Sequence, residues 1–423
     1  MIWPDRLSCL AALLFASGAA HGSDTEFFGH LRERATLIDN SLWGTDSKGE
    51  DWFLTHRYHV GASVAGQNVT ALVEVTGAFQ HGAKGGDSPV EENRLDINRA
   101  WIEIPFADKA LRLRIGRDEW KLGSQRLVGW RDGTNVHRRF NGTRLTATGN
   151  SYDIQLLAGF EAENDPGILD DSLINNRALW GIYSTFDAPL GLSGKVDLYY
   201  LGFDSDRGIN QTLAGQERRH SFGIRLAGED DDWDWDLEGV WQTGHFQPDG
   251  PRQKIQAWTL AGIAGYTFAD LPLSPRLALS ANVASGDRNP TDRTFGAFNA
   301  LFPRGSYFSD LAHLGPRNFY NFNPYLTLNL TEELKVTADM NMFWRYARAD
   351  GVYSPSGSLV FEGDTNAPRH VDTSTSFNLE YQPRNGLFLG AIYTRAAPKA
   401  FVKAQNTDAR TTHFVELTLR FDF

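Results

Sequence analysis

The sequence predicts an all-β fold, namely an antiparallel up-and-down β-barrel that spans a membrane with its strands. Three observations predict it. Apolar and polar residues alternate along most of the chain, which is the two-residue period of a strand with one apolar face. The connections between the alternating stretches are long and short in turn. Aromatic residues make up 12% of the 423 residues and Gly occurs 41 times, which is a composition typical of β proteins.

The first 22 residues form a segment of their own. Arg6 precedes an apolar stretch from Leu7 to Phe15, and Ala20-His21-Gly22 has small residues at the two positions that a signal peptidase reads. This pattern predicts a secretory signal peptide over 1–22 and a barrel domain over 23–423. The single cysteine, Cys9, lies inside the signal peptide, so the exported chain is predicted to contain no disulfide.

Strands account for most of the remaining chain. In the last of them, for example, Val415, Leu417 and Leu419 alternate with Glu416 and Thr418. Most predicted strands have roughly 11 to 16 residues, which suits a tilted membrane strand better than a strand of a soluble sandwich. The eighteen predicted strands are 26–38, 52–65, 67–80, 93–106, 110–120, 138–148, 151–161, 176–187, 193–203, 217–228, 232–246, 253–268, 274–285, 318–330, 333–348, 370–382, 386–396 and 410–423.

The connections fall into two classes that alternate along the chain, whereas a soluble sandwich or propeller has no reason to alternate them. Outer-membrane barrels have long loops outside and short turns inside. The long or polar ones are 39–51, 81–92, 121–137, 162–175, 204–216, 286–317, 349–369 and 397–409, with a shorter one at 247–250. The tight ones are 66, 107–109, 149–150, 230–231, 331–332 and 383–385.

The chain ends in an alternating strand whose last residue is Phe423. This ending resembles the C-terminal signal that the outer-membrane barrel assembly machinery reads. We therefore predict that machinery as a partner during biogenesis, the bacterial outer membrane as the location, and outer-membrane lipid as the surroundings of the apolar face.

The polar face of each strand is predicted to line an aqueous channel, because barrels of sixteen to eighteen strands are too wide to fill with wall side chains alone. In the fifth predicted strand, Arg112 and Arg114 alternate with Leu111 and Leu113. The same parity argument gives a set of channel-lining residues that is rich in arginine: Arg99, Glu103, Arg112, Arg114, Arg144, Arg177, Arg219, Arg225, Glu238, Lys335, Asp339 and Arg345.

The preference for arginine points to anions. The 41 basic residues are 32 Arg and 9 Lys, and the planar guanidinium binds carboxylates through two hydrogen bonds. A ring of inward arginines would concentrate carboxylate-bearing solutes, with Glu103, Glu238 and Asp339 holding the guanidiniums in place. The alternative is that the charges only solvate the wall and pair with one another. The net charge of -11 argues against a nucleic-acid partner.

Three segments of the chain resemble the alginate-export family of outer-membrane barrels. The matching segments are GRDEWKLGSQRLVGWRDGTNVHRRFNGTRL (116–145), SGDRNPTDRTFGAFNALFPRGSYFSDLAHLGPRNFYNFNP (285–324) and FWRYARADGVYSPSGSLV (343–360). The resemblance implies an eighteen-stranded monomeric barrel that passes an anionic polyuronate through an arginine-lined constriction. It adds Arg117, Arg138 and Arg139 to the channel-lining set, and it supports Arg99, Arg144 and Arg345.

Arg117 conflicts with the parity argument, because it alternates in phase with outward Leu113 and Ile115. A bulge near Gly116 would resolve the conflict by shifting the phase of the strand.

The connection 286–317 is longer than a surface loop needs. We predict it as a gating loop, whose aromatic residues either pack inside the mouth of the barrel or serve as stacking platforms for sugars. These residues are Phe295, Phe298, Phe302, Tyr307 and Phe308.

Two other functions compete with a polysaccharide channel. One is an anion-selective porin for small carboxylates, which inward arginines suit equally well. The other is a lipid-modifying hydrolase in the outer membrane, but no Ser–His pair stands on an outward face, and no catalytic or metal-binding motif is present. A receptor with an N-terminal plug domain is excluded by a first strand that begins near Glu26. We predict no enzyme activity, no cofactor and no metal, with Asp287, Asn289 and Asp292 forming a polar turn.

Overall fold

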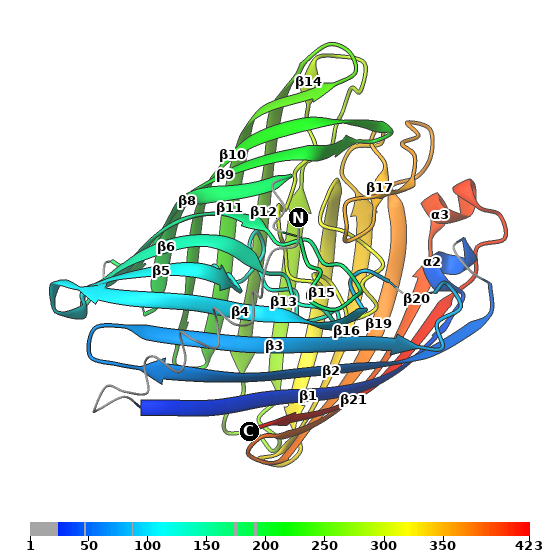
Figure 1. The fold of residues 1–423 in the computed structure, drawn as a ribbon. Helices are drawn as coiled ribbons and strands as arrows, with labels where there is room; N and C mark the ends of the chain where they lie inside the picture. Colours follow the sequence, from blue (N-terminus) through cyan, green and yellow to red (C-terminus); the bar gives the residue numbers. More distant parts are fainter. Residues whose placement is uncertain (1–23, 46–47, 87, 173–175, 190–192) are drawn as a thin grey trace.

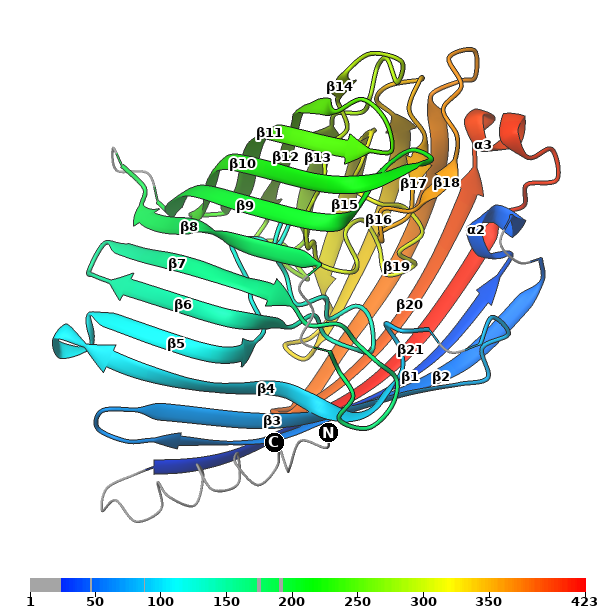
Figure 2. The same ribbon diagram turned by 45° about the horizontal axis from the view of Figure 1, so that its top comes forward.

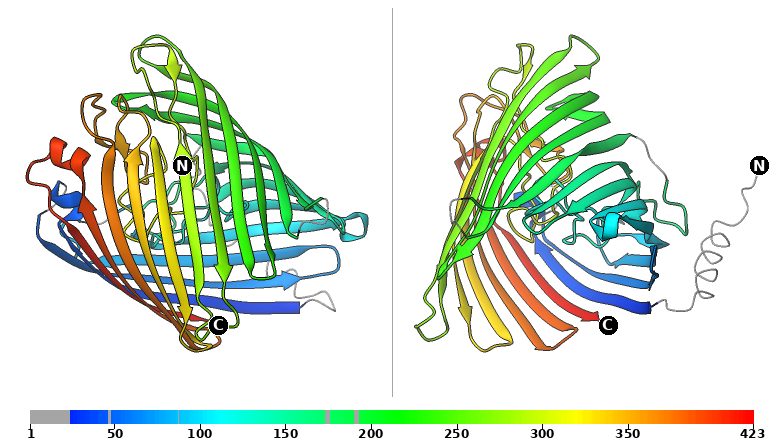
Figure 3. Two further views of the ribbon diagram at one scale, coloured as in Figure 1. Left: turned by 180° about the vertical axis from the view of Figure 1, so that it is seen from behind. Right: turned by 90° about the vertical axis from the view of Figure 1, so that its left-hand side faces the viewer.

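A computed structural model describes residues 24–45, 48–86, 88–172, 176–189 and 193–423. Its architecture is a closed antiparallel barrel in which each strand pairs with the next along the chain, and the first and last strands pair with each other (Figure 1). The predicted signal peptide, 1–22, lies outside the described residues. Within the described residues the wall contains eighteen strands, as predicted, and all of them are strongly tilted (Figure 3).

The wall strands have these bounds: β1 (Asp24–Asp39), β2 (Glu50–Ala65), β3 (Thr70–His81), β4 (Asn93–Phe106), β5 (Leu111–Asp118), β6 (Phe140–Thr148), β7 (Tyr152–Glu161), β8 (Arg177–Asp187), β9 (Lys195–Asn210), β10 (Leu213–Asp230), β11 (Trp233–Pro248), β12 (Gln253–Thr267), β13 (Arg276–Ala284), β15 (Phe319–Asn329), β16 (Leu334–Arg345), β19 (His370–Arg384), β20 (Leu387–Pro398) and β21 (Thr412–Asp422).

Short elements lie in the connections. They are the helices α2 (Ser41–Gly44), η1 (Ala107–Lys109) and α3 (Ala400–Gln405), the strand β14 (Thr294–Phe295), which pairs with β12 in parallel, and the hairpin of β17 (Val352–Tyr353) and β18 (Leu359–Phe361). In the described part of the chain no helix is long and apolar enough to cross a membrane.

The long loop predicted at 204–216 is wrong. β9 runs on to Asn210 and β10 begins at Leu213, so only a two-residue turn separates them. Beyond the bilayer neither face of a strand needs apolar residues, and polar side chains such as Asp204 and Asp206 therefore do not end the strand. The alternation that marks a membrane strand disappears there although the backbone ladder continues.

The two faces of the wall differ as the parity argument predicts. Leu237, Leu260 and Leu417 point outward and are 47%, 57% and 54% exposed, which in a membrane is the surface that meets lipid. Inward-facing Ser221 and Gln242 have no exposed surface, because chain inside the barrel covers them. Two long loops, 119–139 and 285–318, supply most of that cover, and they lie within the ring of strands (Figure 2).

Candidate functional site

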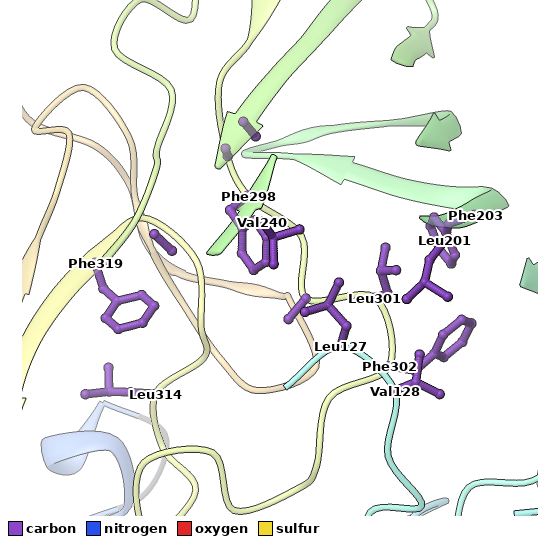
Figure 4. Packing of buried hydrophobic residues seen from close by; sticks show 14 of the residues in the cluster. Leu127, Val128, Leu201, Phe203, Val240, Phe298, Leu301, Phe302, Leu314 and Phe319 are labelled. Atoms are coloured by element: carbon purple, nitrogen blue, oxygen red, sulfur yellow. The ribbon is translucent and has the colours of Figure 1, made fainter. Parts of the chain in front are cut away.

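The two inward loops bind each other through their backbones. The N–H of Phe302 donates to the carbonyl of Leu127 at 2.8 Å, and the N–H of Gly129 donates to the carbonyl of Phe302 at 2.8 Å. The N–H of Arg304 donates to the carbonyl of Gln125 at 3.0 Å. The side chains around this junction form the apolar core of the molecule (Figure 4). The loops therefore form one partition across the barrel.

The predicted gating aromatics take part in this core. Phe295, Phe298 and Phe302 are 0%, 1% and 0% exposed, and Tyr307 and Phe308 pack against the core from its edge. The ring of Phe302 lies edge-on to Phe140 at 5.0 Å between centroids. Of the two alternatives, the structure shows packing inside the mouth; the three buried rings have no free face on which a sugar could stack. The gating role itself stays a prediction.

Loop 119–139 is also fastened to the wall near the first and last strands. Arg32 of β1 donates to the carbonyls of Asp132 and Thr134 at 2.8 and 2.9 Å, and Arg57 of β2 donates to the Asp132 carboxylate at 2.6 Å. Burial alone would raise the pKa of Asp132, but a hydrogen bond with His137 and the charge of Arg57 hold that pKa well below its usual range. The anchor is thus ionised at neutral pH.

On the inner face of β4, β5 and β6 the predicted residues form one continuous run of ion pairs. Arg114 lies 2.8 Å from Glu103 and 2.8 Å from Asp118, and Arg144 lies 3.0 Å from the same Asp118. Arg112 is farther from Glu103, at 3.9 Å, and more exposed. Each cation here has a carboxylate beside it, as the alternative of mutual pairing predicts.

Three more predicted residues form ion pairs across neighbouring strands. Arg99 binds Glu74 at 2.8 Å, Arg225 binds Asp197 at 2.8 Å, and Lys335 binds Glu380 at 2.8 Å. Glu238 binds Arg126 of loop 119–139 at 3.0 Å, so it fastens that loop instead of facing open solvent. Asp339 accepts a hydrogen bond from the side-chain amide of Asn323 at 3.1 Å.

The structure contradicts the channel-lining assignment of Arg117 and Arg139. Arg117 is paired in register with Asn141, and Asn141 with Phe160; residues paired in this way share one face, and Phe160 is 45% exposed on the lipid-facing side. Arg117 and Arg139 both bind Asp171 of the connection that follows β7, described over 162–172, at 3.2 and 2.9 Å. They hold that connection against the outer rim of the wall.

A bulge at Gly116 does not resolve the parity conflict, because the pairing of β5 with β4 and β6 is continuous through that residue. The register shift lies between β3 and β4, where Asn98 is left unpaired. Arg117 therefore keeps its outward phase.

Arg219 and Arg345 face inward but are fully buried, each 0% exposed, so in this structure neither contacts solvent in the channel. Arg219 binds Glu217 at 2.6 Å and the carbonyl of Ala297 at 3.1 Å. Arg345 donates to five carbonyls of loop 346–369 and lies 3.8 Å from the centroid of Phe401. Both act as fasteners of interior loops, which is a correction of their predicted role.

Two adjoining cavities of about 370 and 300 Å³ remain inside the barrel, and both are lined by Pro303, Pro355 and Ser356. Seven guanidiniums and five carboxylates line them together. The larger cavity has Arg34, Arg131, Arg138 and Arg304 with Glu91, Asp310 and Glu416; the smaller has Arg177, Arg207 and Arg317 with Glu161 and Glu217.

Several of these cations lack a carboxylate of their own. In the described part of the chain, no ion pair forms at Arg131, Arg304 or Arg317. Arg138 and Arg177 share Glu161, at 3.0 and 2.6 Å. Burial and the neighbouring Arg131 lower the pKa of Arg138 to about 9, which is still above neutral pH. Among the residues that line the two cavities, positive charge therefore exceeds negative charge.

The alternation of residues along strands could not identify Arg131, Arg304 and Arg317 as interior residues, because they lie in loops. A signal was nevertheless present in the sequence. All three lie within the segments 116–145 and 285–324 that carry the family resemblance. The cluster formed by these segments arises from the backbone contact of the two loops, which no local pattern encodes.

The described residues hold one group of acids close enough to share a metal ion: Asp96, Asp170 and Asp171. Arg117 and Arg139 already neutralise Asp171, and Arg117 also binds Asp96 at 3.3 Å. The segment 287–292 is a polar turn, in which the N–H of Asn289 donates to the Asp287 carboxylate at 3.1 Å.

Comparison with known proteins agrees with this architecture. The family model described as alginate export matches residues 24–411. No protein of curated function matches the chain by sequence.

Similar solved structures include a BenF-like porin from Pseudomonas fluorescens Pf-5, with 10% identity, a TM-score of 0.63 and coverage of 95% of this chain and 98% of that one. OccK2 (OpdF) of Pseudomonas aeruginosa in complex with glucuronate has 11% identity, a TM-score of 0.62 and the same coverage. OccAB4 of Acinetobacter baumannii has 10% identity, a TM-score of 0.64 and again the same coverage. At such low identity these likenesses show the fold alone.

Proposed function

Because the chain belongs to the alginate-export family, we propose that this outer-membrane channel passes an anionic polysaccharide of the polyuronate class, or its oligomers, and does so as a monomer without catalysis. The observation that carries the proposal is the excess of guanidiniums in the two interior cavities, centred on Arg131, Arg304 and Arg317.

The chemistry of this cluster suits a uronate. A guanidinium without a carboxylate partner can offer a passing anion the donors that loop oxygens do not already use, and each charge-assisted hydrogen bond contributes about 1.5–3 kcal/mol. The paired arginines elsewhere on the wall, such as Arg114 and Arg144, contribute to the electrostatic potential inside the barrel but do not bind the solute. Neighbouring carboxylates such as Glu91 and Asp310 keep binding weak enough for release.

An anion-selective porin for small carboxylates is the second candidate, and the size of the cavities favours it. Each has a volume of about 300–370 Å³, at the low end of the range for sites that hold one small ligand. One protein of similar fold, OccK2, was solved with the monosaccharide glucuronate. Passage of a polymer requires the partition formed by loops 119–139 and 285–318 to move.

The test is a planar-bilayer recording of the refolded mature chain in a salt gradient, with uronate monomers, dimers and longer oligomers added to one side. We expect anion selectivity, and block that strengthens with oligomer length. Arg131→Gln combined with Arg304→Gln should weaken block by about tenfold or more. Arg94→Gln is the control, since the Arg94 side chain is 67% exposed and lies outside both cavities.

The outcomes separate the candidates. Anion selectivity with equal block by monomers and oligomers would favour the small-carboxylate porin. A non-selective current that the double variant does not change would refute both. Arg304 is the cleaner site of the two, because its one side-chain hydrogen bond in the described structure is a long contact of 3.5 Å to the carbonyl of Tyr307.

A further inference from the structure

The outer wall of the barrel has two parallel rows of side chains on β10, β11 and β12. Phe222, Trp241 and Trp258 are paired in register and form an aromatic row. Arg218, His245 and Lys254 are also paired in register and form a cationic row. In each strand the two residues are four positions apart and therefore share a face.

That face is the outer one. Phe222 and Trp241 are 46% and 51% exposed, and the side chain of Arg218 is 55% exposed. The residues of opposite phase point into the barrel and are buried, as Arg219 and Phe246 show with 0% exposure each. Both rows thus belong to the surface that meets the membrane and its boundary.

The spacing of the rows places the cations at headgroup height. Aromatic residues on the outside of a barrel mark the boundary between hydrocarbon and headgroups. Four residues of a strand span about 13 Å, and the tilt of a barrel strand reduces this to about 10 Å along the membrane normal. The cationic row therefore lies where the phosphates of an outer-leaflet lipid lie.

Part of the positive charge of this row is free, and Lys254 carries that part. Arg218 is paired with Asp204 at 2.6 Å, whereas within the described residues no ion pair forms at Lys254. Arg252, in the turn beside Lys254, is exposed and adds a further positive charge. The row therefore keeps a net positive charge toward the headgroup layer.

Below the aromatic row the wall is hollowed. A groove of about 730 Å³ is lined by Tyr200, Ile224, Leu260 and the aromatic row itself, and Ile224, Gly239 and Leu260 continue it into a second hollow of about 730 Å³. Gly239 makes part of the space, because a Cβ at that position would meet one atom of Leu260 at 3.2 Å and nothing else within 4 Å. The lining is apolar, as an acyl chain requires.

We propose that this outer face binds the phosphorylated, multiply acylated disaccharide that anchors lipopolysaccharide in the outer leaflet, with a phosphate on the cationic row and an acyl chain in the groove. The site depends on the barrel lying in the outer membrane, and it is independent of what the channel carries. Charge complementarity and the groove select a phosphorylated lipid over a neutral lipid or a second copy of the chain.

The test uses native mass spectrometry of the refolded mature chain in detergent, titrated with the acylated disaccharide bisphosphate, with the same lipid after dephosphorylation, and with inorganic phosphate. Arg218→Gln combined with Lys254→Gln should lower the affinity for the phosphorylated lipid about tenfold or more. Lys48→Gln combined with Lys403→Gln is the matched control. It removes two exposed positive charges from other loops, and like the test variant it leaves one carboxylate, Asp408, without its partner.

We expect the dephosphorylated lipid to bind the wild type as weakly as the phosphorylated lipid binds the double variant, and inorganic phosphate alone to show no saturable binding. Gly239→Val should weaken binding of both lipids by filling the groove. Equal binding of the two lipids, an unchanged double variant, or a lipid-free dimer would overturn the proposal. Folding is checked by heat-modifiable migration. If the double variant fails that check, Lys254→Gln alone replaces it, because no ion pair is lost there.

Discussion

Replacing Phe302 by alanine tests whether the contact between the two interior loops blocks the channel. The Phe302 side chain is 0% exposed and lies between Phe140 and Phe203, at 5.0 and 5.5 Å between ring centroids. The guanidinium of Arg177 lies 4.4 Å from its centroid. The substitution leaves a cavity at the centre of the partition and removes this cation–π contact.

The magnitude follows from the burial. Phe→Ala at a fully buried position costs about 3–5 kcal/mol. The wall hydrogen bonds do not involve this ring, so the cost applies to the docking of loops 119–139 and 285–318 rather than to the barrel. At about 1.4 kcal/mol for each tenfold change, the undocked fraction should rise by a factor of about 10² to several thousand.

Single-channel recording in a planar bilayer measures this directly. We expect the variant to open more often and to conduct a larger mean current than the wild type at the same voltage. The barrel should keep its heat-modifiable migration, because strand pairing from β1 to β21 is unchanged.

The control is Phe322→Ala, which removes an equal side chain from the lipid-facing side, where Phe322 is 46% exposed. Its conductance should match the wild type. If Phe302→Ala also matched the wild type while remaining folded, the partition would not limit the current, and the reasoning would be refuted.

Three further predictions concern other parts of the interior and the wall. Arg345→Met should make loop 346–369 sensitive to protease while the barrel survives, since buried carbonyls left without a donor cost about 1–3 kcal/mol each; uncut loop after limited trypsin treatment would contradict this. Burial raises the pKa of Asp287 to about 6 in the docked loop, above its ordinary value, with Asp350 close by. The docked form is therefore favoured at low pH and loses that stability as pH rises through about 6, so current should grow between pH 5 and 7 in the wild type. It should grow less in Asp287→Asn, in which Asp350 remains as a buried carboxyl with a raised pKa. Gly116→Ala should fail to assemble at 37 °C, because Gly116 has φ of +138° and a Cβ there would lie 2.2 Å from the carbonyl of Ala100; normal yield of folded barrel would show that β5 relaxes.

Local pattern was enough to predict the wall. Each membrane strand must present apolar residues to lipid at every second position, and this pattern can be recognised within a single strand such as β21, which has 11 residues. All eighteen strands were found in this way, and the errors are confined to places outside the bilayer. The predicted strands of the β9–β10 hairpin are too short, because outside the bilayer the strands need no alternation of apolar and polar residues.

For the interior, the sequence predicts which residue types are present but not which residues they contact. The abundance of inward arginine was visible from parity, but the partners were not, because Arg32 meets a carbonyl of Asp132 a hundred residues away in the sequence. Parity assigned Arg345 to the channel, whereas both terminal nitrogens of its guanidinium donate to carbonyls of one loop. The family resemblance placed Arg117 among the channel-lining residues, although its position in the alternating pattern predicts an outward side chain. The strand pairing agrees with the alternating pattern.

By itself, the sequence determined the barrel, its lipid-facing side and the abundance of arginine on its inner face, because the alternation of residues along a strand decides which side meets lipid and which side faces the interior. Only the tertiary structure decided which arginines are free. That choice depends on the stagger of the strands and on two loops that meet inside the barrel, where Phe302 joins Leu127 from 175 positions further along the chain. Contacts at such separation leave no local pattern, and they determine the shape and the charge of the path that a solute would take.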